Sequence, residues 1–162
     1  RRGPAMMPGV PACPGRPTYR TTRPTMAQHR IEITQDFDLP VERVFSALAD
    51  HNNLKNVFGI PVKRIKDGYD SPNGVGSVRA LGVGPLATEE TVTALEPNES
   101  IDYVITKNGG PIMNHQGRIE FEKTSRGSRV TWLIEFDSLP VIGGGVRKVL
   151  ELAITRGLKK LR

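Results

Sequence analysis

A histidine on the inner face of an expected strand is the first candidate for chemistry in this chain. In the strand expected over residues 114–123, Ile119 and Phe121 mark the buried face, and counting back in steps of two reaches Gly117 and His115. A histidine exchanges protons near neutral pH, so His115 is a candidate for proton transfer. Its position near a strand end favours a plainer interpretation, in which solvent or a backbone carbonyl satisfies the imidazole.

Glu90 is the second candidate. Val92 sets an inner face that also holds Glu90, whereas Glu89 points outward, because adjacent strand residues face opposite ways. The two carboxylates therefore do not form a catalytic pair. An unpaired buried carboxylate is costly, and Arg79 on the neighbouring strand is the obvious partner. Leu95 favours the opposite register, and an inward Glu90 fits a structural ion pair as well as it fits ligand recognition.

Three aromatic residues are candidates either for the core or for contact with a ligand. Tyr103 and Trp132 lie on the apolar phase of their expected strands, and Phe58 ends a short helix, where it would guard an opening. Such residues are more often core than ligand contacts. In a hollow fold, however, the core and the cavity wall are the same face.

The chain has few of the motifs that mark strong catalysis. Residues 82–87 match a dinucleotide-binding fingerprint, but a strand pattern follows where a helix should begin, and Pro85 interrupts it. The three histidines, His29, His51 and His115, do not have the spacing of metal ligands. We therefore expect no metal and no cofactor.

The elements that position these residues follow the order strand, two short helices, six strands and a long helix. We expect strands at 29–37, 62–66, 77–83, 88–95, 101–107, 114–123 and 129–136, and helices at 41–50, 54–58 and 143–162. The first helix should begin at Asp38 or Pro40. Consecutive strands with short turns require an antiparallel sheet, which makes this an α+β domain.

The last helix has one unbroken apolar stripe, consisting of Val146, Val149, Leu150, Ala153, Ile154, Gly157, Leu158 and Leu161. A long helix of this kind needs a broad surface, so it should close the open side of a curved sheet. Gly157 costs about 1 kcal/mol relative to alanine, and it makes room for a neighbouring strand or for a ligand. Basic residues at the helix end, Arg156, Lys159, Lys160 and Arg162, complement the helix dipole.

The first 25 residues differ from the rest in composition. They hold six of the thirteen prolines and five arginines without an acid, which predicts a disordered tail, and Met26 is the expected functional start. The whole chain has 23 Lys and Arg against 17 Asp and Glu. Subtracting the five arginines leaves 18 against 17, so residues 26–162 are nearly neutral. This balance argues against a nucleic-acid partner.

Cysteine usage and hydropathy bound the setting. The only cysteine, Cys13, lies in the tail, so disulfides are not expected in the domain, and a reducing, cytoplasmic location fits. No apolar run approaches the roughly 20 residues that cross a bilayer, so integral membrane association is not expected.

Several local motifs carry a resemblance to a known family. They are residues 39–45 (LPVERVF), 74–79 (GVGSVR), the Glu89–Glu90 strand ending at 95–97 (LEP), and 127–132 (GSRVTW). In this order they resemble the helix-grip proteins, a superfamily that includes START domains, and most of all its polyketide cyclase/dehydrase-like group. The resemblance covers residues 27–162. It implies a sheet of about seven strands wrapped round the last helix, with a cavity between them for a small, largely apolar molecule.

We therefore expect a domain that binds a small hydrophobic or amphipathic molecule, lipid-like or polyketide-like. The expected contacts are Phe58, Arg79, Glu90, Tyr103, His115, Trp132, Ile154 and Gly157. The alternative is a polyketide cyclase or dehydratase in which Glu90 or His115 moves a proton. A third hypothesis is an interaction module that uses the basic helix end against a protein or a membrane. The sequence does not predict the oligomeric state.

Overall fold

A computed structural model describes residues 26–161 of the chain. The expected tail over residues 1–25 lies outside the described residues. The elements are β1 (Ala27–Phe37), α1 (Val41–Ala49), α2 (Leu54–Phe58), β2 (Val62–Lys66), β3 (Val78–Leu81), a 3₁₀ turn (Gly84–Leu86), β4 (Thr88–Glu96), β5 (Ser100–Lys107), β6 (Met113–Thr124), β7 (Gly127–Ser138) and α3 (Pro140–Lys159). The predicted order of strands and helices is confirmed.

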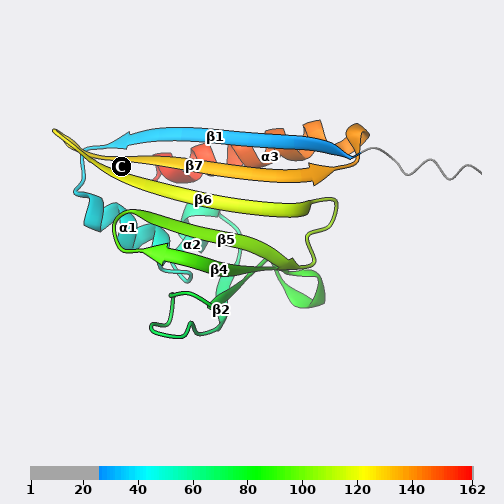
Figure 1. Ribbon diagram of the computed structural model, residues 1–162, viewed down its shortest axis with the longest axis horizontal. Coiled ribbons are helices and arrows are strands. Elements are labelled where there is room, and N and C mark those ends of the chain that lie inside the picture. The colour runs from blue at the N-terminus through cyan, green and yellow to red at the C-terminus, as the bar shows by residue number, and fades with distance from the viewer. Residues whose placement is uncertain (1–25, 162) are drawn as a thin grey trace, which may run out of the picture.

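Within residues 26–161 the strands form one seven-stranded antiparallel sheet in the order β1-β7-β6-β5-β4-β3-β2. The first strand thus pairs with the last, and the other strands follow as successive hairpins. The sheet is curved, and α3 lies along its concave side behind β1 and β7, with α1 and α2 filling the remaining end (Figure 1). This is the predicted α+β helix-grip architecture.

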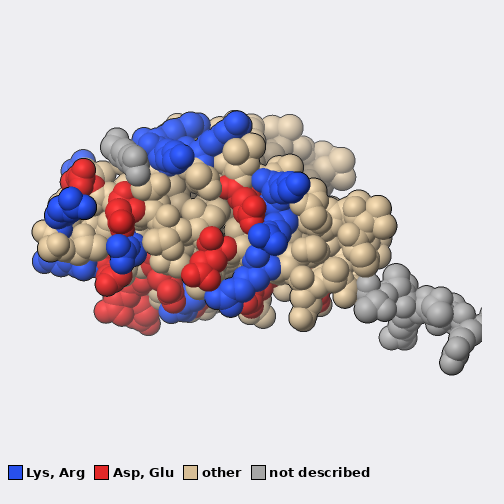
Figure 2. All heavy atoms as spheres, turned by 90° about the horizontal axis from the view of Figure 1, so that it is seen from above, with Lys and Arg blue, Asp and Glu red and all other residues tan. Residues whose placement is uncertain are grey.

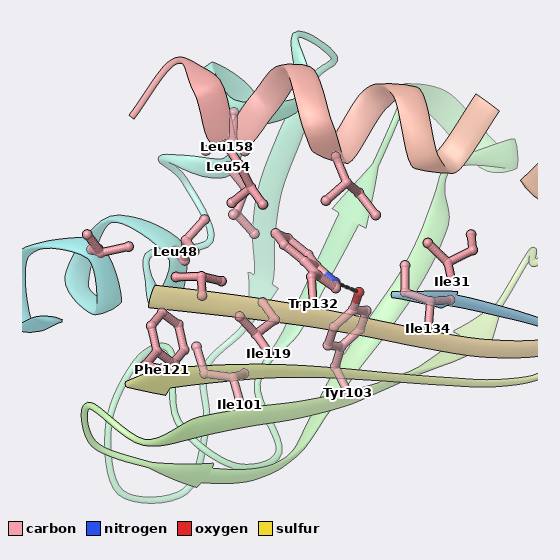
Figure 3. Packing of buried hydrophobic residues seen from close by; sticks show 14 of the residues in the cluster. Ile31, Leu48, Leu54, Ile101, Tyr103, Ile119, Phe121, Trp132, Ile134 and Leu158 are labelled. Carbon is pink, nitrogen blue, oxygen red and sulfur yellow. Dashed lines mark hydrogen bonds between the residues drawn. The ribbon is translucent and has the colours of Figure 1, made fainter. Parts of the chain in front are cut away.

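Alternating burial along the strands produces the core. In β6 and β7, Ile119, Phe121, Val130, Trp132 and Ile134 are buried, whereas the residues between them are more exposed. This period of two is what a sheet with one covered face requires. The inward side chains pack beneath α3, where they contact Leu158 of α3 and Leu54 of α2 (Figure 3).

The outward face of the sheet carries mixed charges. Arg30 binds Glu135 at 3.0 Å across the β1–β7 pair, and Arg118 binds Asp102 at 2.7 Å across the β5–β6 pair. Basic and acidic side chains therefore stand beside one another over much of the surface (Figure 2). Exposed pairs of this kind contribute about 0–1 kcal/mol each to the free energy of unfolding. They therefore keep this face of the sheet polar and add little to its stability.

Two details of the long helix correct the sequence analysis. The long helix begins at Pro140, three residues before the predicted start, because proline is favoured in the first turn of a helix. Its apolar stripe is interrupted, since Val149 is 68% exposed. The buried face instead follows Gly143, Ile154, Gly157 and Leu158. Helix α1 is preceded by Pro40, one of the two predicted positions, and no side chain caps it.

Candidate functional site

A buried ion pair joins strands β3 and β4 inside the sheet. Arg79 and Glu90 are direct partners in the register, and the Arg79 Nε and Nη2 atoms each lie 2.7 Å from Glu90 Oε2. The side chains are 2% and 10% exposed. The structure thus decides the register that Leu95 had left open: Glu90 points inward to Arg79, and Glu89 binds Lys107 at the more exposed side.

Tyr103 lies at the centre of this buried group. Its hydroxyl oxygen accepts a hydrogen bond of 2.8 Å from Trp132 Nε1 (Figure 3), and the Arg79 guanidinium lies 4.6 Å from the centre of the phenol ring. Burial raises the pKa of Tyr103 above its usual value, and the Glu90 carboxylate adds to this effect. Tyr103 is therefore a neutral phenol that keeps its own hydrogen for donation.

His115 stands beside Tyr103, with 5.5 Å between the ring centres. Strand β6 changes register between Met113 and Gln116, and Asn114 has a left-handed backbone (φ 50°), so a bulge directs the histidine inward. The Nδ1 atom is buried without a hydrogen-bond partner among the described residues. Burial lowers the pKa of His115, so the imidazole is neutral at pH 7.

Phe58 lies between the aromatic core and a hollow at the surface. Its ring meets Trp132 edge to face, with 5.7 Å between the ring centres, and Ile154 of α3 is buried in the same core. Phe58 also lines a hollow of about 360 Å³ between α2 and α3, together with Val57, Val149, Leu152, Ala153, Arg156 and Lys160. The aromatic interior and this hollow thus share one side chain as their common wall.

Gly157 lies where another element of the fold packs closely against helix α3. A Cβ atom at this position would lie 2.6 Å from the Val57 backbone oxygen. The close neighbour is therefore helix α2, and not a strand, which was one of the two neighbours that the sequence analysis expected. Gly157 allows α2 and α3 to approach one another beside the hollow.

The expected open cavity between sheet and helix is occupied by large side chains. Arg79, Tyr103 and Trp132 are each less than 4% exposed and take up the concave side of the sheet. Hollows of about 550 and 520 Å³ lie elsewhere, over outward residues of β1, β6 and β7 such as Arg30, Gln116 and Glu135. A ligand between the sheet and α3 would therefore have to displace or rearrange side chains.

Sequence reasoning missed a second buried histidine. His51, 1% exposed, lies between α1 and α2, and its Nε2 atom is 2.8 Å from the Ser77 hydroxyl. Burial, helped by the charges of Arg79 and Arg64, lowers its pKa to about 3. Counting back in steps of two from Arg79 would have placed Ser77 on the inner face. His51 lies in a turn, where no periodicity reports burial.

The described part of the chain bears on two further questions, metal binding and membrane spanning. No three His, Cys, Asp or Glu side chains of residues 26–161 gather closely enough to hold a metal ion. None of the described helices is long and apolar enough to cross a membrane.

Six of the eight expected contact residues do come together in the interior, namely Phe58, Arg79, Glu90, Tyr103, His115 and Trp132.

A family model matches most of the chain. Residues 28–162 match the family described as polyketide cyclase / dehydrase and lipid transport. No curated protein matches the chain.

Comparison with solved structures supports the fold. A protein from Nitrosospira multiformis is similar with a TM-score of 0.65 and 19% identity, covering 83% of this chain and 97% of the other. Ara h 8.0201 gives 0.61 and 15%, covering 83% and 98%. Truncated norcoclaurine synthase from Thalictrum flavum gives 0.64 and 12%, covering 86% and 96%. At these identities the likeness concerns the fold alone.

Proposed function

Because the chain belongs to the polyketide cyclase / dehydrase and lipid transport family, we propose that it binds a small amphipathic molecule between the sheet and α3. The observation that carries this proposal is the Nδ1 atom of His115, buried beside Tyr103 without a partner. An unsatisfied buried polar atom costs about 1–3 kcal/mol. A ligand that offers it a hydrogen bond removes this cost.

The two sides of the proposed site suit the two ends of such a molecule. The polar end meets His115 and the Tyr103 hydroxyl, which accepts from Trp132 and retains a hydrogen to donate. The Arg79 guanidinium, itself paired with Glu90, lies 4.6 Å from the centre of the Tyr103 ring. The apolar body packs against Phe58, Trp132 and other buried side chains in place of their present contacts. Lipid-like and polyketide-like molecules both have this division.

Access to the proposed site runs past Phe58. This side chain is half-buried, and it separates the hollow beside α2 and α3 from the Trp132 ring. A rotation of Phe58 would open the hollow to the aromatic interior. The ligand would then replace the edge-to-face contact with Trp132 by its own apolar surface.

Trp132 provides the test, because it is the only tryptophan in the chain. Titration with oleate, and separately with the aromatic polyphenol naringenin, should change its emission saturably with at least one of them. Tyr103→Phe should weaken binding about two- to tenfold, the range for one hydrogen bond. Tyr69→Phe is the matched control, since Tyr69 is 78% exposed, and it should bind like the wild type. An unchanged emission with both probes, and no bound molecule in native mass spectra of the purified chain, would refute the proposal.

A second candidate function is proton transfer on a polyketide-like substrate. The observation that favours it is the pairing of a neutral imidazole with a neutral phenol, since the pKa of His115 is lowered and that of Tyr103 is raised. His115 would accept a proton, and Tyr103 would donate a hydrogen bond to the developing oxyanion. Glu90 is engaged by Arg79 and acts on this pair through its charge. His115→Gln that retains binding but loses turnover would support an enzyme, whereas a wild-type protein that binds such a substrate without turning it over would support binding alone.

A further inference from the structure

The outer face of α3 exposes aliphatic side chains that a solvated helix face would not carry. Val141 is 95% exposed, Val149 68% and Leu152 49%. Positions eight and three residues apart lie on one side of a helix, and this side is opposite the buried residues Gly143, Ile154 and Gly157 that face the sheet and α2. We call these three aliphatic residues the outer ridge of α3.

Four exposed cations accompany the outer ridge: Lys148, Arg156, Lys159 and Lys160. None of them makes an ion pair with another described residue, whereas the acid within the helix, Glu151, is bound to Arg147 at 2.8 Å. Blue side chains accordingly gather along the upper edge of the molecule in Figure 2, on the side where α3 lies. This half of the surface differs from the outward face of the sheet, where cations and carboxylates pair.

The hollow beside Phe58 opens on the same face. Its walls include Val149 and Leu152 of the outer ridge and the cations Arg156 and Lys160. Whatever covers the ridge therefore also covers the hollow and the outer side of Phe58.

We propose that this face of α3 docks on a bilayer that contains anionic lipids. The aliphatic side chains of the ridge enter the boundary between headgroups and acyl chains, and the four cations reach the lipid phosphates. Flexible lysine side chains suit this position because their stems lie along apolar surface while the ammonium group stays in the polar layer. Docking would bring the hollow and Phe58 to the surface of the membrane.

The composition of the face favours a lipid surface over a protein partner. Protein interfaces are enriched in aromatic residues and depleted in lysine, whereas the ridge is aliphatic and three of its four cations are lysines. The aliphatic residues are also spread along the helix, with Gly144, Gly145 and Lys148 between them. A row of this kind matches a planar boundary.

Sedimentation of the full chain with vesicles tests the proposal. Vesicles of phosphatidylcholine mixed with phosphatidylserine should bind the chain, and vesicles of phosphatidylcholine alone should bind it much more weakly. The double variant Lys159→Gln/Lys160→Gln should reduce partitioning by about thirtyfold, from about 1 kcal/mol for each cation near an anionic surface. High salt should release the protein.

Two matched controls separate docking from bulk charge and from general hydrophobicity. Lys123→Gln/Arg126→Gln removes two exposed, unpaired charges from the β6–β7 hairpin and should leave partitioning nearly unchanged. Leu152→Gln should weaken binding about tenfold, and Leu86→Gln, at a position 83% exposed outside α3, should not. Circular dichroism should be the same for all variants, since each side chain is exposed.

Two outcomes would overturn the proposal. The first is equal binding to both kinds of vesicle. The second is binding that survives both α3 variants, because it would then belong elsewhere in the chain, such as the five arginines of the first 25 residues. Neither outcome concerns the interior, because vesicle sedimentation needs no molecule bound beside Trp132. The proposed ligand binding and the proposed docking can therefore fail separately.

Discussion

Gly117 and Tyr103 are direct partners across strands β6 and β5, and the phenol ring of Tyr103 lies where a side chain at position 117 would stand. The glycine thus makes room for the ring. From that position Tyr103 accepts the hydrogen bond of Trp132 and meets the Arg79 guanidinium. A residue without a side chain therefore organises the buried polar group.

Gly117→Ala tests this relationship. The added methyl group would overlap the Tyr103 ring, so the ring must move and the hydrogen bond from Trp132 must lengthen or break. We expect a loss of about 1–3 kcal/mol in the free energy of unfolding, the usual cost of overpacking, together with a shift in Trp132 emission. Chemical denaturation followed by fluorescence measures both. Unchanged stability and emission would mean that the Tyr103 ring can occupy another position without cost.

The stability of the protein should depend strongly on the presence of both Arg79 and Glu90. Arg79→Met leaves the Glu90 carboxylate buried without its cation, and Glu90→Leu leaves the guanidinium alone, so each should cost about 3–5 kcal/mol. The double variant should be much less destabilised than the sum of the two, because apolar side chains of similar volume can replace a buried ion pair. Urea denaturation of all four proteins completes the cycle. Additive losses would show that the pair is not coupled.

Stability should fall on mild acidification because His51 is held neutral. Its pKa is lowered to about 3 in the folded chain, against about 6.5 in an unfolded chain. Below about pH 6.5 the unfolded state therefore takes up a proton that the folded state does not. Because of this group, the free energy of unfolding should decrease by about 1.4 kcal/mol for each pH unit between about pH 6.5 and 3. Above about pH 6.5 the stabilisation that comes from the neutral His51 is fully present.

His51→Gln should remove this part of the pH dependence. The variant should lose stability at pH 7, where the hydrogen bond to Ser77 is disturbed, but its denaturation midpoint should fall less than that of the wild type between pH 7 and 5. Carboxylates contribute mainly below this window, so the difference between the two proteins reports the histidine. Parallel curves for both proteins would contradict the assignment.

Two glycines on α3 should respond in opposite ways to alanine. At Gly157 a methyl group would meet the Val57 backbone, which has no rotamer to escape to, so Gly157→Ala should cost about 1–3 kcal/mol despite its better helix propensity. At Gly145 nothing lies within 4 Å, so Gly145→Ala should stabilise the protein by about 0.5–1 kcal/mol. Thermal denaturation compares them. A stabilising Gly157→Ala would mean that α2 is free to shift away from α3.

The periodicity of the sequence was enough for much of the fold and part of the site. Alternation in β6 led from Ile119 to His115, because a strand with one covered face repeats every two residues. In β4, Val92 and Leu95 indicated opposite faces for Glu90, and alternation alone did not choose between them. The apolar stripe of the last helix predicted that this helix closes the open side of the sheet, and the resemblance to helix-grip proteins added the expectation of a cavity between them. These inferences needed only residues that are neighbours along one strand or one helix.

The sequence by itself thus determined the order of the elements, the antiparallel sheet and the inward phase of the strands that carry Tyr103, His115 and Trp132. Only the tertiary structure decided that Glu90 and not Glu89 points inward to Arg79, that Trp132 donates to Tyr103, and that Gly157 faces helix α2. It also decided that His51 is buried and that Val149 is exposed. The physical reason is that local patterns report which face a residue occupies, whereas its partners depend on segments far away in the chain.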